Sequence, residues 1–134
     1  MTRRITSLGG LVLIAALLGA GCGGGESEPE LYRLEPTRSC LEGAGLEVTT
    51  EELDFVASTA TGGALRTDIA ANHATVSFGE TPEEAERTAE AYRNFAGPRI
   101  PIDHVLFRYE NAVVVWGAPP SEEERTRVVS CLAA

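Results

Sequence analysis

The stretch His104-Val-Leu-Phe-Arg-Tyr-Glu-Asn-Ala-Val-Val-Val-Trp-Gly117 is the clearest indicator of the fold. Strand-forming residues lie on both sides of Glu110-Asn111, a pattern that predicts two antiparallel strands joined by a two-residue turn. Asn111 is the residue expected to adopt positive φ, because asparagine tolerates the left-handed region. In this register one sheet face carries Val105, Phe107, Tyr109, Ala112, Val114 and Trp116.

The opposite face of this hairpin is more apolar than a fully solvated face should be. It carries Leu106, Val113 and Val115, with Arg108 beside them. If no helix covers this face, the four residues form an exposed stripe of the kind that marks a partner surface. If helices pack on both faces of the sheet, the apolar residues belong to the core. The sequence leaves both interpretations open.

Helix and strand signals alternate through the rest of the chain. They are a short helix from Pro36 through Gly43, a brief strand over 46–49, a helix after a capping-box motif at 49–52, a hairpin over 65–78 with its turn near Asn72, a helix over 81–96 and a terminal helix from Ser121. This order predicts an α+β domain with helices packed on a small antiparallel or mixed sheet. A ferredoxin-like arrangement is one candidate, and the strand order stays open.

The charge balance excludes several classes of function. The 134 residues include eleven basic side chains, all of them arginine, and twenty acidic ones, for a net charge of −9. Without lysine, the chain lacks both the P-loop lysine and the Schiff-base lysine. An acidic surface also disfavours nucleic acid, because phosphate contacts need a basic patch. We therefore expect no nucleic-acid partner.

The N-terminal segment has the order of residues found in a bacterial export signal. Arg3 and Arg4 precede an apolar run from Leu8 to Ala20, and small residues lead to Cys22. As a helix this run would span only about 20 Å at ~1.5 Å per residue, whereas a hydrocarbon core is roughly 30 Å thick. The pattern therefore favours a signal peptide over a transmembrane anchor.

The residues Leu18-Gly19-Ala20-Gly21-Cys22 resemble the lipobox of bacterial membrane lipoproteins. The resemblance implies that residues 1–21 are a signal peptide removed after Gly21 and that Cys22 is lipidated, with acyl chains such as palmitate. It also implies a lipid-anchored location on the extracytoplasmic side of the cell membrane, where two acyl chains give the stable attachment that one chain does not. An ordinary secretory signal that places Cys22 near its cleavage site by coincidence is the alternative.

The glycine-rich and acidic residues after Cys22 are typical of a flexible tether. Three glycines and then Glu26-Ser27-Glu28-Pro29-Glu30 cannot form a core. We therefore expect residues 22–35 to be the lipidated cysteine and its tether, and residues 36–134 to form a single domain.

Two cysteines remain once Cys22 is assigned to lipid. Cys40 and Cys131 lie near the two ends of the expected domain, in its first and last helices. Leftover cysteines in an exported chain are more often a disulfide than free thiols. In the chain-entropy model, closing a loop of about 90 residues stabilises a domain by roughly 4.6 kcal/mol. A reactive thiol is the alternative, but the sequence has no C-x-x-C pair.

No residue pattern in the chain indicates a catalytic, cofactor or metal site. His73, Asp103 and His104 could form a metal site, but neighbouring residues on a strand point to opposite faces. No G-x-S-x-G motif is present. The glutamates at 122–124 fit the first turn of a helix. Tyr109 and Trp116 could form a ligand platform, although such aromatic residues are more often core.

The sequence thus favours a small non-enzymatic lipoprotein of the cell envelope, without cofactor, that acts as a binding or assembly module for an envelope protein. A non-lipidated secreted carrier or inhibitor is the alternative. An envelope enzyme with an unrecognised site is less favoured.

Replacing the lipidated sulfur tests this interpretation. The substitution Cys22→Ser should move the protein from the membrane fraction to the soluble fraction, because serine cannot form the thioether. Fractionation followed by immunoblotting measures the change, with Ser27→Ala in the same tether as the control that stays membrane-bound. Co-fractionation of Cys22→Ser with membranes would contradict the lipid anchor.

Overall fold

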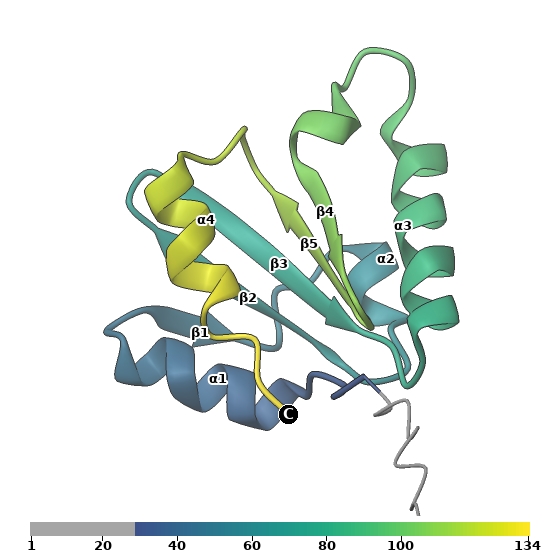
Figure 1. Cartoon of the computed structure of the whole chain (residues 1–134). Helices are drawn as coiled ribbons and strands as arrows, with labels where there is room; N and C mark the ends of the chain where they lie inside the picture. The colour runs from purple at the N-terminus through teal and green to yellow at the C-terminus, as the bar shows by residue number, and fades with distance from the viewer. Residues whose placement is uncertain (1–28) are drawn as a thin grey trace, which may run out of the picture.

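A computed structural model describes residues 29–134, where four α-helices surround a five-stranded antiparallel sheet (Figure 1). The elements are α1 (Leu34–Gly43), β1 (Glu47–Thr49), α2 (Phe55–Ser58), β2 (Ala64–Ile69), β3 (Asn72–Phe78), α3 (Pro82–Ala96), the 3-10 turn η1 (Ile102–His104), β4 (Leu106–Tyr109), β5 (Ala112–Trp116) and α4 (Glu122–Val129). The predicted α+β class is confirmed. The signal peptide and Cys22 lie outside the described residues.

The sheet has the strand order β1-β2-β3-β5-β4, and every neighbouring pair is antiparallel. Helices α1 and α4 contribute Leu41 and Val128 to the core on one face, while α2 and α3 contribute Val56 and Ala89 to the core on the other. The ferredoxin-like candidate is wrong because of the strand order. The chain contains the element order βαββαβ, but in the split βαβ units of that fold another strand lies between the two strands that a helix joins. Here β1 and β2, which α2 joins, are direct neighbours in the sheet.

The hairpin of β4 and β5 has the predicted register, in which Phe107 faces Val114 and Tyr109 faces Ala112. The six side chains assigned to one face all pack in or against the core that α1 and α4 cover. The expected conformation of the turn is wrong. Glu110 has the positive φ, at 47°, and Asn111 does not.

Asn111 instead uses its side chain to hold the N-terminal segment against the sheet. Asn111 is 1% exposed, and its Oδ1 accepts a hydrogen bond from the backbone N–H of Tyr32 at 2.8 Å. Its Nδ2 donates to the carbonyl oxygens of Tyr32 at 2.9 Å and of Gly79 at 2.8 Å. One buried side chain therefore joins the start of the domain, the end of β3 and the β4–β5 turn.

The second face of the hairpin is covered by α3. Leu106 and Val113 are 6% and 0% exposed and pack in one cluster with Ala85 and Ala89 of that helix. Of the four residues considered as a partner surface, these two are core, and Val115 is half-buried against the same cluster. Only Arg108 is exposed, and its guanidinium lies 3.1 Å from the Glu86 carboxylate on α3. Helices therefore pack on both faces of the sheet, which is the second interpretation of the sequence. Ala85 and Ala89 are small and let α3 approach the sheet closely.

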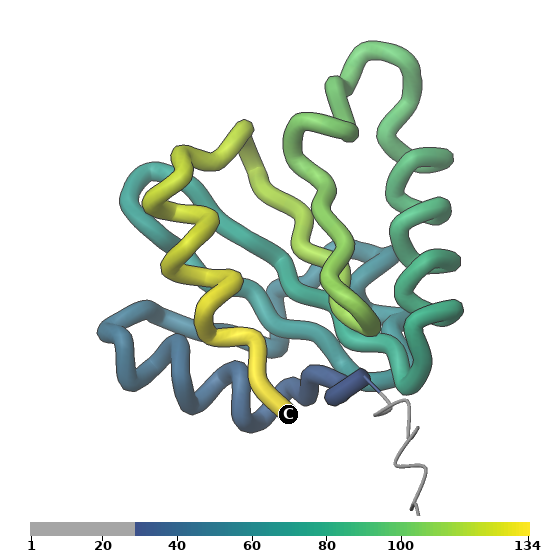
Figure 2. The backbone as a smooth tube through the Cα atoms, viewed as in Figure 1, coloured from purple at the N-terminus to yellow at the C-terminus, as the bar shows by residue number. Residues whose placement is uncertain are grey.

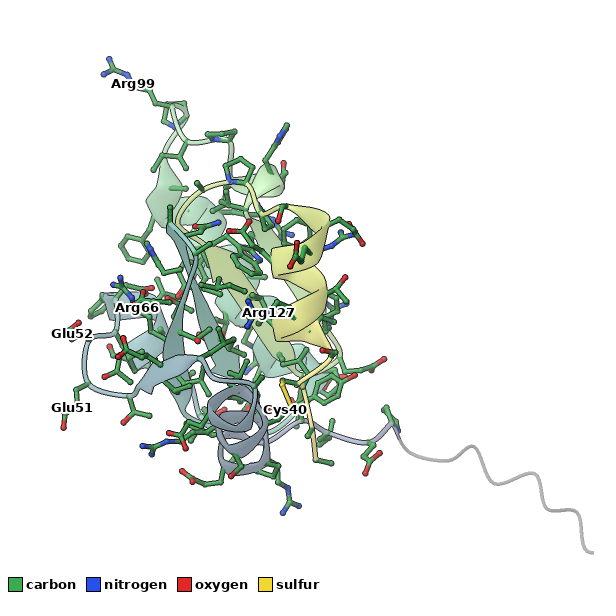
Figure 3. All side chains as sticks on the ribbon, turned by 90° about the vertical axis from the view of Figure 1, so that its left-hand side faces the viewer. Cys40, Glu51, Glu52, Arg66, Arg99 and Arg127 are labelled. Carbon is green, nitrogen blue, oxygen red and sulfur yellow. A yellow bond between two sulfur atoms is a disulfide. The ribbon has the colours of Figure 1, made fainter. Side chains whose placement is uncertain are left out.

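Cys40 and Cys131 form the expected disulfide, with Cα atoms 5.3 Å apart and a sequence separation of 91 (Figure 3). Cys40 lies in α1, but Cys131 lies just beyond the end of α4 rather than inside it. The C-terminal residues run beside the start of α1 in Figure 2, where the Arg33 N–H donates to the Ala133 carbonyl at 2.7 Å. The bridge and this contact close the domain at its two ends.

The helix starts agree with the sequence at α3 and α4 and differ at α2. Thr81 caps α3, and Ser121 and Glu124 form a complete capping box at α4. The capping box expected at 49–52 is wrong. Asp54 caps α2 instead, accepting a hydrogen bond from the Ala57 N–H at 2.9 Å. The turn of the first hairpin lies at residues 70–71, next to Asn72 as expected.

The Asn111 contacts give a stability prediction. The substitution Asn111→Ala should lower the free energy of unfolding by about 2–4 kcal/mol, because the Tyr32 N–H and the Gly79 carbonyl lose their partner in a buried position. Urea denaturation measures the change. Asn94→Ala on the exposed side of α3 is the control and should alter stability by less than about 1 kcal/mol. Equal effects of the two substitutions would contradict the assigned role.

Candidate functional site: an apolar groove beside the third helix

An apolar groove of about 650 Å³ lies beside the C-terminal end of α3. Its walls come from α2, the last turn of α3, the segment 100–105 and the end of β5. The lining residues are Asp54, Phe55, Val56, Tyr92, Phe95, Ala96, Ile100, Pro101, Ile102, Val105, Val115, Trp116, Gly117, Ala118 and Pro119. A volume of roughly 300–1,000 Å³ with mostly apolar walls is typical of sites for small ligands.

The rim of the groove exposes three large apolar side chains. Phe55, Phe95 and Ile100 are 72%, 70% and 52% exposed, and no other large apolar residue is exposed in the part of the chain that the structure describes. The rings of Phe55 and Phe95 meet edge to face, with centroids 5.9 Å apart. Single exposed apolar residues are common on protein surfaces, but their convergence on one concavity is typical of a binding site.

The buried part of the groove includes Trp116, which is 3% exposed. Its indole N–H is buried and has no hydrogen-bond partner within residues 29–134. Buried donors are rarely left unpaired in folded proteins. Trp116 is also the single tryptophan of the chain, so tryptophan fluorescence comes from one residue that lies in the core and lines the groove.

The polar part of the groove is a pair formed by Asp54 and Tyr92. The Tyr92 hydroxyl donates to the Asp54 carboxylate, with distances of 2.8 Å to Oδ2 and 3.0 Å to Oδ1. Burial, reinforced by the neighbouring carboxylate, raises the pKa of the Tyr92 phenol well above its ordinary value. The phenol therefore stays protonated and keeps donating to Asp54 at physiological pH.

Asp54 is the one charged residue that lines the groove. Two donors fix its carboxylate, the Tyr92 hydroxyl and the Ala57 N–H, and none of the ion pairs within residues 29–134 involves it. The nearby cation Arg93 lies between two other carboxylates, at 3.7 Å from Glu86 and 3.9 Å from Asp103. The groove therefore presents one oriented negative charge beside an apolar surface.

The groove and the start of the described chain lie toward opposite ends of the domain. Arg99, next to Ile100, marks the tip of the loop after α3 in Figure 3, and the chain enters the domain at the lower end in the same view. Figure 1 shows the same separation, with the loop after α3 at the top and the first described residues at the bottom.

The residues weighed for metal binding do not form a site. His73 packs against Gly117, where any side chain would collide with its ring. Within residues 29–134 no group of three or more histidine, cysteine or acidic residues could hold a metal ion. Glu124 belongs to the α4 capping box. Tyr109 packs against the core, and Trp116 is both core and groove.

The groove was not predicted from the sequence, although one signal for it is present. Along α3 the apolar face runs through Ala85, Ala89, Tyr92 and Ala96, and Phe95 falls outside it. A large aromatic residue on the polar side of a helix has no core to enter. Together with Phe55, which follows the helix-capping Asp54, it could have indicated an exposed apolar site.

No family model matches this chain, and neither the curated proteins nor the solved structures include a match to it. Within the described part of the chain, no helix is long and apolar enough to cross a membrane.

The Asp54–Tyr92 pair predicts how stability changes at alkaline pH. The pKa of Tyr92 is higher in the folded state than in the unfolded state, where it is about 10, so its contribution is complete below about pH 10 and is lost as pH rises further. In Tyr92→Phe, the free energy of unfolding should fall less between about pH 9 and 11 than it does in the parent protein. Urea denaturation across this range measures it, with Tyr32→Phe as the control. An unchanged pH dependence in Tyr92→Phe would contradict the prediction.

Proposed function

We propose that this chain is a small lipoprotein of the bacterial cell envelope, anchored by Cys22, whose extracytoplasmic domain binds an apolar ligand in the groove between α2 and α3. The observation that carries the proposal is the convergence of Phe55, Phe95 and Ile100 on one concavity. Full burial of a side chain of this size typically contributes about 1.5–3 kcal/mol of favourable free energy, which these exposed side chains do not gain. A bound ligand would recover part of that contribution.

The Cys40–Cys131 disulfide supports an exported location, since such bonds persist in oxidising compartments. The position of the groove is compatible with a lipid anchor. Because the tether joins the domain at the end away from the groove, an anchored domain can turn the groove away from its own membrane. The acidic net charge also repels the domain from anionic leaflets. The expected ligand therefore comes from the envelope space, as a dissolved molecule or as part of an envelope protein.

A secreted carrier is the second candidate, and the same groove favours it. The two functions differ only in the fate of Cys22, which the fractionation of Cys22→Ser decides. An envelope enzyme has less support, because the groove is lined by neither histidine nor cysteine and its one carboxylate is already bonded to Tyr92. This arrangement offers no general base paired with a nucleophile.

Binding of a neutral apolar dye tests the groove directly. The mature chain carrying Cys22→Ser, which lacks only the lipid, should bind Nile red with a rise in dye fluorescence. Phe55→Ser and Phe95→Ser should each weaken binding about fivefold, because each removes roughly 1 kcal/mol of apolar contact. Fluorescence titration measures the affinities.

The control for this experiment is Arg99→Ser, which changes an exposed residue beside the groove without removing apolar surface. Its affinity for the dye should stay within about twofold of the parent, since surface substitutions have small effects. If the parent fails to bind the dye, or if Phe55→Ser and Phe95→Ser bind it as well as Arg99→Ser does, the groove is not the binding site.

A further inference from the structure

The chemistry of the groove goes beyond a general affinity for apolar molecules. Asp54 is next to Phe55 in the sequence, and Phe55 meets Phe95 edge to face. Two phenyl rings, the Tyr92 ring and a carboxylate therefore line one cavity. The faces of aromatic rings carry negative potential and attract cations, with a contribution of about 0.5–1 kcal/mol at exposed sites.

The Asp54 carboxylate is prepared to receive a positive group. The hydroxyl of Tyr92 and the N–H of Ala57 hold it in one orientation. Both donors are neutral groups, so these contacts orient the carboxylate and leave its negative charge without a cationic partner within the described residues. Asp54 is also solvent-exposed, which lets a ligand reach it without first breaking an ion pair within the described domain.

The other charges in this region disfavour an anionic ligand. Arg93, on the helix that forms one wall, is shared between Glu86 and Asp103. Arg108 is paired with Glu86 as well. The chain as a whole has twenty acidic side chains against eleven basic ones. Arg99, next to Ile100, is an exposed cation that forms none of the ion pairs within residues 29–134, but it does not line the groove. A fatty-acid carboxylate inside the groove would therefore meet the like charge of Asp54.

We propose that the groove binds an amphipathic ammonium compound, with its apolar chain against Phe95, Ile100 and Trp116 and its cationic group between Asp54 and Phe55. The proposal rests on the proposed function, in which the groove is the binding site, and adds the chemical class of the ligand. The combination of aromatic rings with one oriented carboxylate recognises alkylammonium groups, whereas a purely apolar groove does not distinguish them from alcohols.

Three compounds with the same alkyl chain separate charge from apolar contact: decyltrimethylammonium, decanol and decanoate. The mature chain carrying Cys22→Ser is titrated with each compound below its aggregation limit. Trp116 fluorescence and calorimetry report binding. Decyltrimethylammonium should bind about threefold to thirtyfold more tightly than decanol. This factor corresponds to the combined free energies of an exposed ion pair and a cation–π contact. Decanoate should bind most weakly.

The substitution Asp54→Asn isolates the charge. Asparagine is an equally good helix N-cap, and its amide oxygen can still accept from Tyr92 and Ala57. The affinity for decyltrimethylammonium should fall about twofold to fivefold, while the affinity for decanol stays the same. Asp68→Asn on β2 removes the same charge from an exposed site and should leave both affinities unchanged.

The outcomes distinguish the ligand class from the binding site. If decanol and decyltrimethylammonium bind equally well, or if Asp54→Asn does no more than Asp68→Asn, the ammonium proposal is overturned and the apolar groove stands. Tightest binding by decanoate overturns it as well. If none of the three compounds changes Trp116 fluorescence or releases heat, both the ammonium proposal and the groove as binding site are overturned.

Discussion

The packing of α3 on β4 and β5 is the contact on which the rest of the site depends. The first half of the helix presents Ala85 and Ala89, which are small enough for the backbone to approach Leu106 and Val113. This contact buries the apolar second face of the hairpin. The large aromatic side chains of α3 are confined to its last part, where Tyr92 and Phe95 line the groove. The change from small to large residues along one helix therefore sets where the core ends and the groove begins.

Asp54 connects this packing to the chemistry of the groove. One carboxylate caps α2 and accepts the Tyr92 hydroxyl from α3, so it fixes the short helix relative to the long one. The same contacts hold Phe55 close to Phe95. Because burial and Asp54 raise the pKa of Tyr92, the phenol keeps its proton and the arrangement persists at physiological pH. The residue that fixes the two helices is thus also the residue that we propose recognises the ligand.

Local signals predicted much of the fold. The β4–β5 register followed from alternation, and α3 and α4 followed from their caps. The Cys40–Cys131 bond followed from the count of cysteines once an export signal was predicted. Each of these predictions depends on residues close in sequence or on that predicted signal. The covering of the second hairpin face could not be predicted, because it depends on how α3 returns across the sheet.

The wrong turn prediction and the missed groove also result from contacts between residues far apart in the sequence. Asn111 is a residue type that suits a turn position with positive φ. In the structure its carboxamide is buried and hydrogen-bonds to Tyr32 and Gly79. Glu110 adopts the strained positive-φ conformation instead. The groove was missed because its walls come from segments up to 65 positions apart, from Asp54 to Pro119 in the chain, and only the tertiary structure brings them together. Periodicity finds residues that share an element and cannot find residues that share a cavity.

The central claim is that the concavity beside α3 is where this domain meets its ligand. Backbone amide shifts of the mature Cys22→Ser chain, recorded by NMR during a titration with decanol, test it most directly. The account predicts shifts that concentrate in α2, the last turn of α3 and the segments 100–105 and 115–119. Shifts that instead concentrate around Tyr32 and Gly79, where the chain enters the domain, would contradict it.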